Sequence, residues 1–370
     1  MARTIVGLND PKAVKKFSAI LANDVARDSY FQSRFMGRGE SASTPIQMLS
    51  DLEADAGDQI SYDLSVQLKM APIEGDDILE GNEEPLKFYT DTVYVDQVRS
   101  GVNTGGRMTR KRTLHDMRKI ARRRQGEWWQ RFFDECFFIY LSGARGVNTE
   151  FVTPVGWTGR ANNSLSAPDS SHIAYAGAAT SKGTITSSTK LSLSDVDKLI
   201  AKAKMMGGGS VETPRIQPIK IDGENHFVLV MSPYQEYDVR TSSTTGQWLD
   251  IQKAATTAIG KDSPIFKGGL GLYNNVVLHV HDAIIRFSDY GSGNNLPANR
   301  ALFLGAQAAV CAFGTPGGNG SGLRFDWRED EADRGNQVII STSSIFGIKK
   351  TTYNSLDFGV IAVDTYAIAP

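Results

Sequence analysis

The chain has 370 residues, and 41% of them are hydrophobic, so it is long enough to bury a core and to form two or three lobes. Its formal net charge of −1 excludes a global electrostatic attraction to nucleic acid or to a membrane surface. Neither a membrane-spanning apolar segment nor the apolar centre of a signal peptide is present in the sequence. Cys136 and Cys311 both lie in apolar runs, which is typical of small core residues in a reducing compartment, so we expect no disulfide and folding in a cytoplasm.

The first residues predict a helical arm. Asp10 and Pro11 supply an N-cap and a first helical residue, and apolar side chains then recur at helical spacing as far as about Arg27: Val14, Phe17, Leu21 and Val25. The segment Met36–Ser43 contains Gly and Ser and predicts a flexible link. Residues 1–43 are therefore expected to form an N-terminal arm that packs against another part of the assembly.

Residues 59–99 predict a long two-stranded arm with an acidic loop at its end. Gln59–Met70 alternates apolar and polar residues without a break, which is the pattern of a half-buried strand, and Leu86–Arg99 is a second extended run. Carboxylates crowd the segment between them: Glu74, Asp76, Asp77, Glu80, Glu83 and Glu84. An isolated two-stranded ribbon is marginally stable in water, so we expect the arm to lie on a second copy of the chain.

A long helix is predicted over Thr109–Leu141. Its apolar stripe, in which Gln125 is the one polar member, consists of Leu114, Met117, Ala121, Trp128, Phe132, Cys136 and Ile139. Thr109 is the predicted N-cap and Gly143 the predicted stop, which gives a helix of about 50 Å. The first half carries eight cations, whereas the second half is apolar nearly all round, so the helix is expected to start on a wet, cationic surface and to end inside a core.

The remaining chain predicts a surface insertion followed by a mixed lobe. Residues 143–190 are rich in Ser, Thr, Asn and Gly and have little periodicity, and Leu193–Met206 then forms a helix that Ser192 or Ser194 caps. Trp248–Ala258 is a predicted helix, and Ala301–Phe313 a strand followed by a helix. The predicted strands are His226–Met231, Asn275–Val280, Val338–Lys349 and Phe358–Asp364.

Residues suited to catalysis are few. His279 and His281 share one strand face beside Asp282, but their apolar neighbours favour an ordinary sheet over a metal site, and spacing identifies no third ligand. The glycine runs at 207–209 and 314–322 lack the residues of a phosphate loop and are interpreted as turns. We therefore predict no enzymatic activity, no cofactor and no metal.

The local charges allow several interpretations. The acidic loop lacks the spacing of a calcium-binding loop and is either simply solvated or in contact with the basic helix of a neighbouring subunit. The predicted contact joins the six carboxylates named above to Arg118, Lys119, Arg122 and Arg123. Direct contact of the basic half-helix with DNA is a less favoured alternative, because the aromatic residues that follow have core spacing.

The order of these elements, together with three strings of residues, resembles a known family. The strings are Pro264–His279 (PIFKGGLGLYNNVVLH), Arg300–Ala309 (RALFLGAQAA) and Gly335–Thr365, which contains IFGIKKTTYNSLDFGVIAVDT. The chain is similar to the major capsid proteins of tailed bacteriophages with the Hong Kong-97-type fold, closest to the N-four-type podophage coat proteins. The resemblance extends from Asp10 to the end and is weakest across residues 143–190.

This resemblance implies an α+β Hong Kong-97-like capsid fold. Its parts map onto the chain as follows: an N-terminal arm at 1–43, an extended loop with its base strands at 44–107, a peripheral domain at 108–213 with a spine helix at 109–141 and the insertion at 143–190, an axial domain at 214–326, and closing strands at 327–370.

The implied function is that of a shell subunit. Copies would assemble as hexamers and pentamers of an icosahedral shell around a double-stranded DNA genome, in the cytoplasm of the host bacterium, and end in the virion. The implied partners are other copies, a portal, a scaffold, decoration or cement proteins and the packaged DNA, with no membrane. Arg110, Lys111 and Arg112 are candidates for a basic surface that faces the genome. The alternatives are an encapsulin-like nanocompartment shell, which would enclose cargo protein, and a nucleic-acid-binding protein that uses the basic helix.

Overall fold

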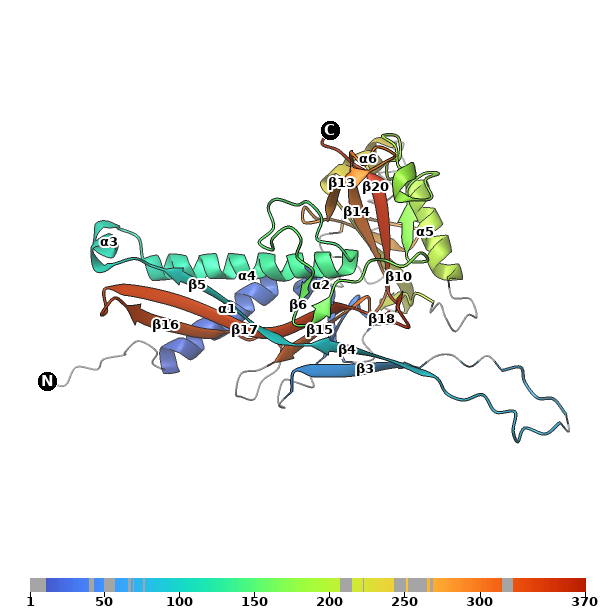
Figure 1. The fold of residues 1–370 in the computed structure, drawn as a ribbon, viewed down its shortest axis with the longest axis horizontal. Coiled ribbons are helices and arrows are strands. Elements are labelled where there is room, and N and C mark those ends of the chain that lie inside the picture. Colours follow the sequence, from blue (N-terminus) through green and yellow to red (C-terminus); the bar gives the residue numbers. More distant parts are fainter. Residues whose placement is uncertain are drawn as a thin grey trace.

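The molecule is elongated, and an arm extends from one end (Figure 1). The computed structural model describes residues 11–39, 43–49, 57–65, 68, 70–75, 77–206, 215–221, 223–242, 251, 265–266, 269–314 and 322–370. A long helix runs above a narrow sheet, and a second lobe, which contains the C-terminus, rises beside the end of that helix (Figure 1). Among the described residues, every helix is too short or too polar to cross a membrane.

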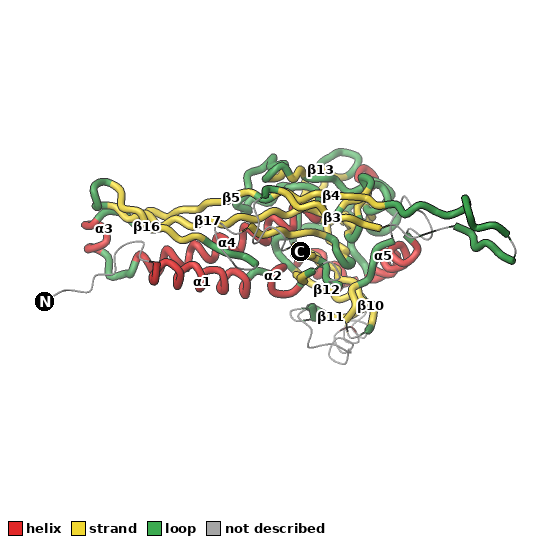
Figure 2. Tube along the Cα trace, turned by 90° about the horizontal axis from the view of Figure 1, so that it is seen from below, coloured by secondary structure: helices red, strands yellow, loops and turns green. Residues whose placement is uncertain are grey.

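The narrow sheet supports the long helix. Its strand order is β1-β2-β15-β17-β16, and β5 also pairs with β17. The bounds of its strands are Met36–Arg38 for β1, Ile46–Leu49 for β2, Asp96–Asn103 for β5, Ala309–Gly314 for β15, Asp326–Ala332 for β16 and Gln337–Lys350 for β17. Helices α1 (Pro11–Asp28) and α4 (Met117–Ser142) run alongside these strands (Figure 2).

The N-terminal segment follows its prediction in part. Helix α1 begins at Pro11, as expected, and ends one residue beyond Arg27; Asp10 lies outside the described residues. The short helix α2 (Tyr30–Arg34) follows. The prediction of a flexible link over 36–43 is wrong for its first three residues, because β1 pairs in parallel with β2 and so joins the sheet.

The second lobe is built on the other large sheet. Its order is β11-β12-β10-β14-β20-β8, with β13 paired to β14 and β9 paired to β10. The bounds are Ile173–Tyr175 for β8, Ile219–Ile221 for β9, Glu224–Met231 for β10, Gly271–Tyr273 for β11, Val276–Val280 for β12, Arg286–Tyr290 for β13, Leu296–Leu304 for β14 and Val360–Tyr366 for β20. The predicted strands in this lobe, at 226–231, 275–280 and 358–364, are confirmed.

Two helices pack in this lobe. Helix α5 (Leu193–Met205) starts at a capping box in which Ser192 and Asp195 satisfy each other's backbone, which confirms one of the two predicted caps. Helix α6 (Pro233–Ser242) was not predicted. The helix expected at 248–258 lies outside the described residues except for Ile251.

The long helix is interrupted, and this corrects its prediction as one helix over 109–141. Helix α3 (Arg107–Arg112) ends before Thr113, and α4 starts after Asp116, whose carboxylate accepts the backbone N–H groups of Arg118 and Lys119. Asp116 is therefore the N-cap, a role that was expected of Thr109. Its carboxylate also stabilises the positive end of the helix dipole. Leu114, assigned to the apolar stripe, is fully exposed.

The end of α4 matches the prediction. Gly143 adopts a left-handed conformation with φ of 69°, which terminates the helix as expected. A Cβ atom at this position would lie 2.2 Å from the carbonyl oxygen of Ser166, so the insertion that follows packs directly on the helix end. With 26 residues, α4 spans about 39 Å rather than the expected length of about 50 Å.

Residues 301–313 form two strands, whereas a strand and a helix were expected. Strand β14 ends at Leu304, the chain turns at Gln307, which has φ of 55°, and β15 begins in the other sheet at Ala309. The run is apolar on both faces because both strands are buried, and such a run does not distinguish a strand from a buried helix.

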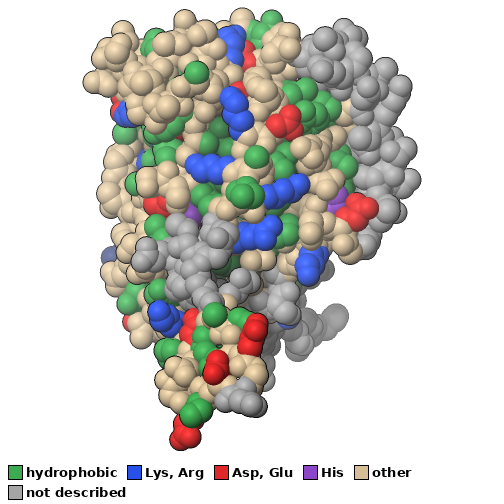
Figure 3. Space-filling view, turned by 90° about the vertical axis from the view of Figure 1, so that its right-hand side faces the viewer, with side chains coloured by type: hydrophobic (Ala, Val, Ile, Leu, Met, Phe, Trp, Pro, Cys, Tyr) green, Lys and Arg blue, Asp and Glu red, His purple; other side chains and the backbone are tan. Residues whose placement is uncertain are grey.

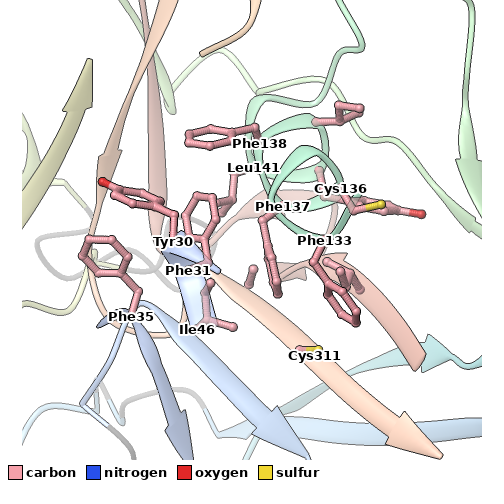
Figure 4. Close-up of a cluster of buried hydrophobic side chains, with 14 of the residues drawn as sticks. Tyr30, Phe31, Phe35, Ile46, Phe133, Cys136, Phe137, Phe138, Leu141 and Cys311 are labelled. Atoms are coloured by element: carbon pink, nitrogen blue, oxygen red, sulfur yellow. The ribbon is translucent and has the colours of Figure 1, made fainter. Parts of the chain in front are cut away.

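The main core lies under the second half of α4. Phe137 and Phe138 of α4 pack against Phe31 of α2, which also contacts Phe35 (Figure 4), and Phe133 stacks on Phe346 of β17. The two cysteines, Cys136 and Cys311, are fully buried thiols in this core, as their apolar context predicted. The one polar member of the predicted stripe, Gln125, is also buried, and its side-chain oxygen accepts a hydrogen bond of 2.9 Å from Thr342.

Candidate functional site

The arm predicted at residues 59–99 is present as a ribbon at its base. Strands β3 (Gln59–Ser65) and β4 (Phe88–Tyr94) pair antiparallel, with Gln59 opposite Tyr94 and Ser65 opposite Phe88. Both strands are shorter than expected, and the second predicted run continues into the body as β5 after Val95. The part beyond Ser65 and before Phe88 extends away from the body (Figure 1). We call residues 59–94 the arm.

The outer part of the arm exposes apolar side chains. Six of them are between 39% and 72% exposed: Leu68, Met70, Ile78, Leu79, Leu86 and Phe88. Scattered exposed apolar residues are normal on a protein surface, but six within 21 positions of one projecting segment mark an interaction surface.

The predicted acidic residues lie on the same segment. Glu74, Asp77, Glu80 and Glu83 are exposed, and Asp76 lies outside the described residues. Glu84 is half-buried and accepts the backbone N–H of Met70 at 2.7 Å, which ties the two sides of the loop together. Figure 3 views the molecule from the arm's end and shows acidic and hydrophobic side chains together on the projection, with Lys and Arg side chains on the body above it.

A groove of about 580 Å³ between α1 and α4 gathers three of the four cations that were predicted to contact a neighbour. We call it the basic groove; it is lined by Asp24, Arg27, Asp28, Lys119, Ile120, Arg122, Arg123, Arg124, Gly126, Glu127 and Gln130. Glu127 pairs with Arg124 at 2.6 Å and with Arg123 at 3.1 Å, and the hydrogen bond from Arg124 lowers the pKa of Glu127. Lys119, Arg122 and Arg123, three of the four cations predicted to contact a neighbour, therefore share one groove.

The fourth predicted cation, Arg118, is placed elsewhere. Its guanidinium pairs with Glu329 of β16 at 2.6 Å, and the Glu329 side chain is only 4% exposed. Both residues line a separate hollow of about 410 Å³ between the start of α4 and strands β16 and β17. Arg118 thus fixes the start of α4 to the sheet within its own subunit.

The other basic group lies at the end of the body opposite the arm (Figure 1). Lys111 and Arg112 on α3 are exposed, and Arg110 is half-buried. Arg110 and Arg107 donate to the carbonyl oxygens of Asn336 and Gly335, in the turn between β16 and β17. Helix α3 is therefore fastened to this turn by arginine side chains and presents its other cations to solvent.

The two histidines considered as metal ligands pack against aromatic rings. His279 is buried, and its Nε2 donates to the carbonyl oxygen of Ile265 at 2.7 Å. The ring of His281 lies 4.5 Å from Tyr30 and 4.9 Å from Phe138. Burial lowers the pKa of both histidines, to about 4 for His279. They join β12 of the second lobe to the N-terminal segment and α4, and no cluster suited to a metal occurs among the described residues.

Sequence reasoning missed the residues that hold the base of the arm. Asp91 of β4 accepts the hydroxyl of Tyr62 at 2.8 Å and pairs with Lys349 of β17. On the other side, Arg160 and Asn163 of the 143–190 insertion bind the backbone around Val95. The one available signal was the turn-forming string Gly159–Asn163, which in a polar segment looks like any surface loop.

The chain belongs to a family of viral coat subunits. A family model described as phage capsid protein matches residues 5–369. The chain is 26% identical over 374 residues to the major capsid protein of Pseudomonas phage KPP25, with 91% of each chain covered. Among solved structures, it is similar to the capsid of Ralstonia phage GP4, with 49% identity, a TM-score of 0.86, and coverage of 100% of this chain and 99% of that one.

A more distant likeness supports the fold. The capsid asymmetric unit of cyanophage Pam1 matches with a TM-score of 0.70 at 21% identity, covering 93% of this chain and 94% of that one. These findings confirm the predicted Hong Kong-97-like α+β fold and the function of a tailed-phage major capsid protein, which assembles with its own copies into an icosahedral shell and is a component of the virion. Neither the nanocompartment shell nor the nucleic-acid-binding protein is favoured.

Proposed function

We propose that neighbouring subunits are joined when the arm of one subunit lies on the body of the next and its acidic loop enters the basic groove. The contact pairs Glu74, Asp76, Asp77, Glu80, Glu83 and Glu84 with Lys119, Arg122 and Arg123. The observation that carries this proposal is the exposed apolar and acidic surface of the arm, which projects away from its own subunit. A groove of opposite local charge on the same chain gives that surface a matching partner.

Apolar burial and charge contribute differently to this contact. Covering apolar surface contributes about 25 cal/mol for each Å², so the six exposed apolar side chains of the arm supply most of the free energy. Exposed ion pairs contribute at most about 1 kcal/mol each, so the acidic loop mainly sets orientation and register. Because every subunit both gives and receives an arm, modest contacts add up over a closed shell.

Arg118 has the smallest part in this contact. Its guanidinium already pairs with Glu329, so a carboxylate from a neighbour gains little by approaching it. Its loss would act mainly through the start of α4 in the same subunit.

The large-scale roles follow from the two sheets. We infer that the sheet under α4 belongs to the peripheral domain and that the second sheet belongs to the axial domain. The bounds expected from the sequence, 214–326 for the axial domain and 108–213 with 327–370 for the peripheral domain, do not follow these sheets. Strand β15 lies in the sheet under α4, whereas β8 and β20 lie in the second sheet. The axial domain would surround the centre of hexamers and pentamers. Within the extended loop (44–107), the arm at 59–94 would reach neighbours, with assembly in the host bacterial cytoplasm. The N-terminal arm (1–43) was also expected to pack elsewhere, but Leu21, Phe31 and Phe35 are buried in the core of their own subunit, and β1 joins its sheet.

Further partners of the shell are part of this proposal. Lys111 and Arg112 would face packaged double-stranded DNA, since exposed cations attract phosphate without reading sequence. Arg110, the third expected residue of this surface, is half-buried and donates to Asn336 of its own subunit, so it would contribute less. A portal, a scaffold and decoration or cement proteins are the remaining expected partners. The protein acts mechanically and not as an enzyme: the histidines it places in its core serve packing.

Deletion of Pro72–Glu84 tests the arm contact. The shortened subunit should keep its fold, because these residues lie outside both sheets, but it should fail to close shells. Sedimentation followed by negative-stain imaging of the fastest fraction measures this outcome. Normal closed particles from the shortened subunit would contradict the proposal.

Exchange of Lys119, Arg122 and Arg123 for Ser separates the shell contact from DNA binding. If the groove receives an arm, assembly fails while the DNA affinity of the free subunit barely changes. Strong, salt-sensitive DNA binding that the exchange removes would instead support the nucleic-acid interpretation of this helix.

A further inference from the structure

Strand β4 of the arm passes into the body within a single residue. Strand β4 ends at Tyr94 as a partner of β3, and β5 begins at Asp96 as a partner of β17, so only Val95 separates arm from body. The backbone N–H of Val95 donates to the carbonyl oxygen of Asp58 at 2.8 Å. The torsion angles around Val95 therefore contribute to the direction in which the arm leaves the subunit, together with the packing of Ile60 and Val93 against Val310 and Ala312 of β15.

A short hairpin from the insertion lies against this junction. Its strands are β6 (Gly159–Arg160) and β7 (Asn163–Ser164), and both turn residues between them have left-handed backbones, as a two-residue hairpin turn requires. Tyr140 of α4 fastens the hairpin to the helix. Its hydroxyl donates to the carbonyl oxygen of Asn163 at 2.8 Å and accepts the N–H of Arg160 at 3.0 Å.

The side chain of Asn163 binds the last residue of the arm. It accepts the backbone N–H of Tyr94 at 3.0 Å and donates its amide to the carbonyl oxygen of the same residue at 2.8 Å. Asn163 is 2% exposed, so water does not compete for these bonds. A buried amide that satisfies both backbone groups of one residue imitates a neighbouring strand and fixes that residue in place.

Arg160 binds the other side of the junction. One arm of its guanidinium donates to the carbonyl oxygen of Asp96 at 2.7 Å, and the other donates to that of Phe346 on β17 at 3.0 Å. The guanidinium also lies 4.1 Å from the centre of the Phe346 ring. The hairpin thus holds the residues before and after Val95 and the strand beneath them.

Gly347 of β17 also lies against the last residue of the arm. A Cβ atom there would lie 2.0 Å from the carbonyl oxygen of Tyr94, so the strand crosses directly over this glycine. The carbonyl oxygen of Tyr94 therefore lies close to both Gly347 and the Asn163 amide.

We propose that Arg160 and Asn163 are positioning residues for assembly: by clamping the chain on both sides of Val95, they set the direction of the arm and so the place where it meets a second copy of this chain. This inference rests on the proposed arm contact. A ribbon of seven residues is about 23 Å long, so a rotation of ~10° at its base moves its end by about 4 Å. A displacement of that size separates a charged loop from its groove.

The variant Asn163→Ala tests the clamp, and Ser164→Ala is its matched control because Ser164 is exposed on the same short strand. Loss of Asn163 should raise hydrogen exchange at the Tyr94 amide about tenfold, while the amides of α4 stay protected. The altered subunit should form irregular or open particles in place of shells of one diameter. Ser164→Ala should behave like the unaltered protein in both measurements.

A second variant guards against a folding defect. Asn163→Asp keeps an acceptor for the Tyr94 N–H but loses the donor to its carbonyl oxygen, so it should loosen the arm while the hairpin stays in place. Uniform shells of unchanged diameter from both Asn163 variants would overturn the inference. Unchanged hydrogen exchange of the Tyr94 amide in Asn163→Ala would overturn it as well.

The arm deletion separates this inference from the proposal beneath it. If the deletion of Pro72–Glu84 blocks closure while both Asn163 variants close normally, the clamp fails and the arm contact stands. If the deletion itself closes normally, the arm contact fails and the clamp has no part in assembly.

Discussion

The core beneath α4 and the arm use the same apolar residue types for opposite purposes. In the core, Phe133 is 1% exposed and stacks on Phe346 with 4.3 Å between ring centres. On the arm, Phe88 is 58% exposed, and Leu79 is equally open. The core residues stabilise the subunit by themselves, whereas the arm residues gain their stabilisation only when another copy covers them.

The two regions also differ in how polar groups are used. In the core, buried polar groups bond to one another: Gln125 and Trp129 both bond to Thr342 there. The base of the arm combines a small apolar cluster around Ile60 and Val93 with polar contacts from Asp91 and Asn163 to partners far away in sequence. Directional bonds define an orientation better than apolar contacts do, which suits an element that must leave the body at one angle.

The largest expected effect is the loss of a core ring. Phe133→Ala leaves a cavity between α4 and β17 and should lower the free energy of unfolding of the subunit by about 3–5 kcal/mol. Urea unfolding of the unassembled subunit measures this. A loss below about 1 kcal/mol would contradict the contrast between core and arm, since the core would then not be the source of subunit stability.

A pH titration of the same core should give a smaller effect. Burial lowers the pKa of His279 to about 4, so its contribution to stability is complete above about pH 6.5 and is lost as pH falls toward 4. With about 1.4 kcal/mol for each pH unit between the two pKa values, the largest loss is about 3 kcal/mol. His279→Gln, which keeps a donor for Ile265, should lose less stability between pH 7 and pH 4.5 than the unaltered subunit.

Other titratable and charged groups near His279 also affect this pH titration. Burial raises the pKa of Asp134 to about 6, and its contribution runs in the opposite direction, since it is present at low pH and lost as pH rises through 6. Arg34, His281 and Asp282 also face the cluster. The comparison of two subunits that differ only at His279 removes these shared contributions, and equal pH dependence in both would refute the assignment.

Changing an apolar residue on the arm should affect assembly without affecting folding. Phe88→Ser should alter the free energy of unfolding of the subunit by less than about 0.5 kcal/mol, because the ring is already largely in water. It should raise the subunit concentration needed for shell formation by about tenfold, which corresponds to about 1.4 kcal/mol for each contact. Sedimentation over a concentration series measures this, and an unchanged threshold would show that the ring stays exposed in the shell.

Local patterns predicted most of the elements, but not their interruptions. The alternation in β3, the apolar runs of β10 and β20 and the stop at Gly143 each have a cause within a few residues. The break before Asp116 was missed because the stripe was extended through Leu114, which has helical spacing and yet is exposed. Residues 301–313 were misassigned because their burial on both faces comes from two different sheets.

The site was predictable only where charge gathers along the chain. The acidic loop and the cations of α4 are dense in the sequence, so they could be named in advance. The sequence does not show which of those cations are free to meet a neighbour. Arg118 pairs with Glu329, on a strand about 210 positions away, whereas Lys119 lines the basic groove. The turn-forming string around Arg160 and Asn163 does not indicate what these residues bind, because their partners at Phe346 and Tyr94 come from other parts of the chain.

The smallest expected effect concerns the ion pairs inside the basic groove. Arg123→Ala removes one exposed partner of Glu127, and the helix keeps the pair with Arg124, so subunit stability should change by less than about 0.5 kcal/mol. Assembly should still weaken measurably, and more so at low salt, because the same cation is proposed to meet the acidic loop of a neighbour. If instead the threshold for assembly is unchanged at every salt concentration while unfolding is destabilised, Arg123 serves its own helix, and the groove receives the arm through Lys119 and Arg122 alone.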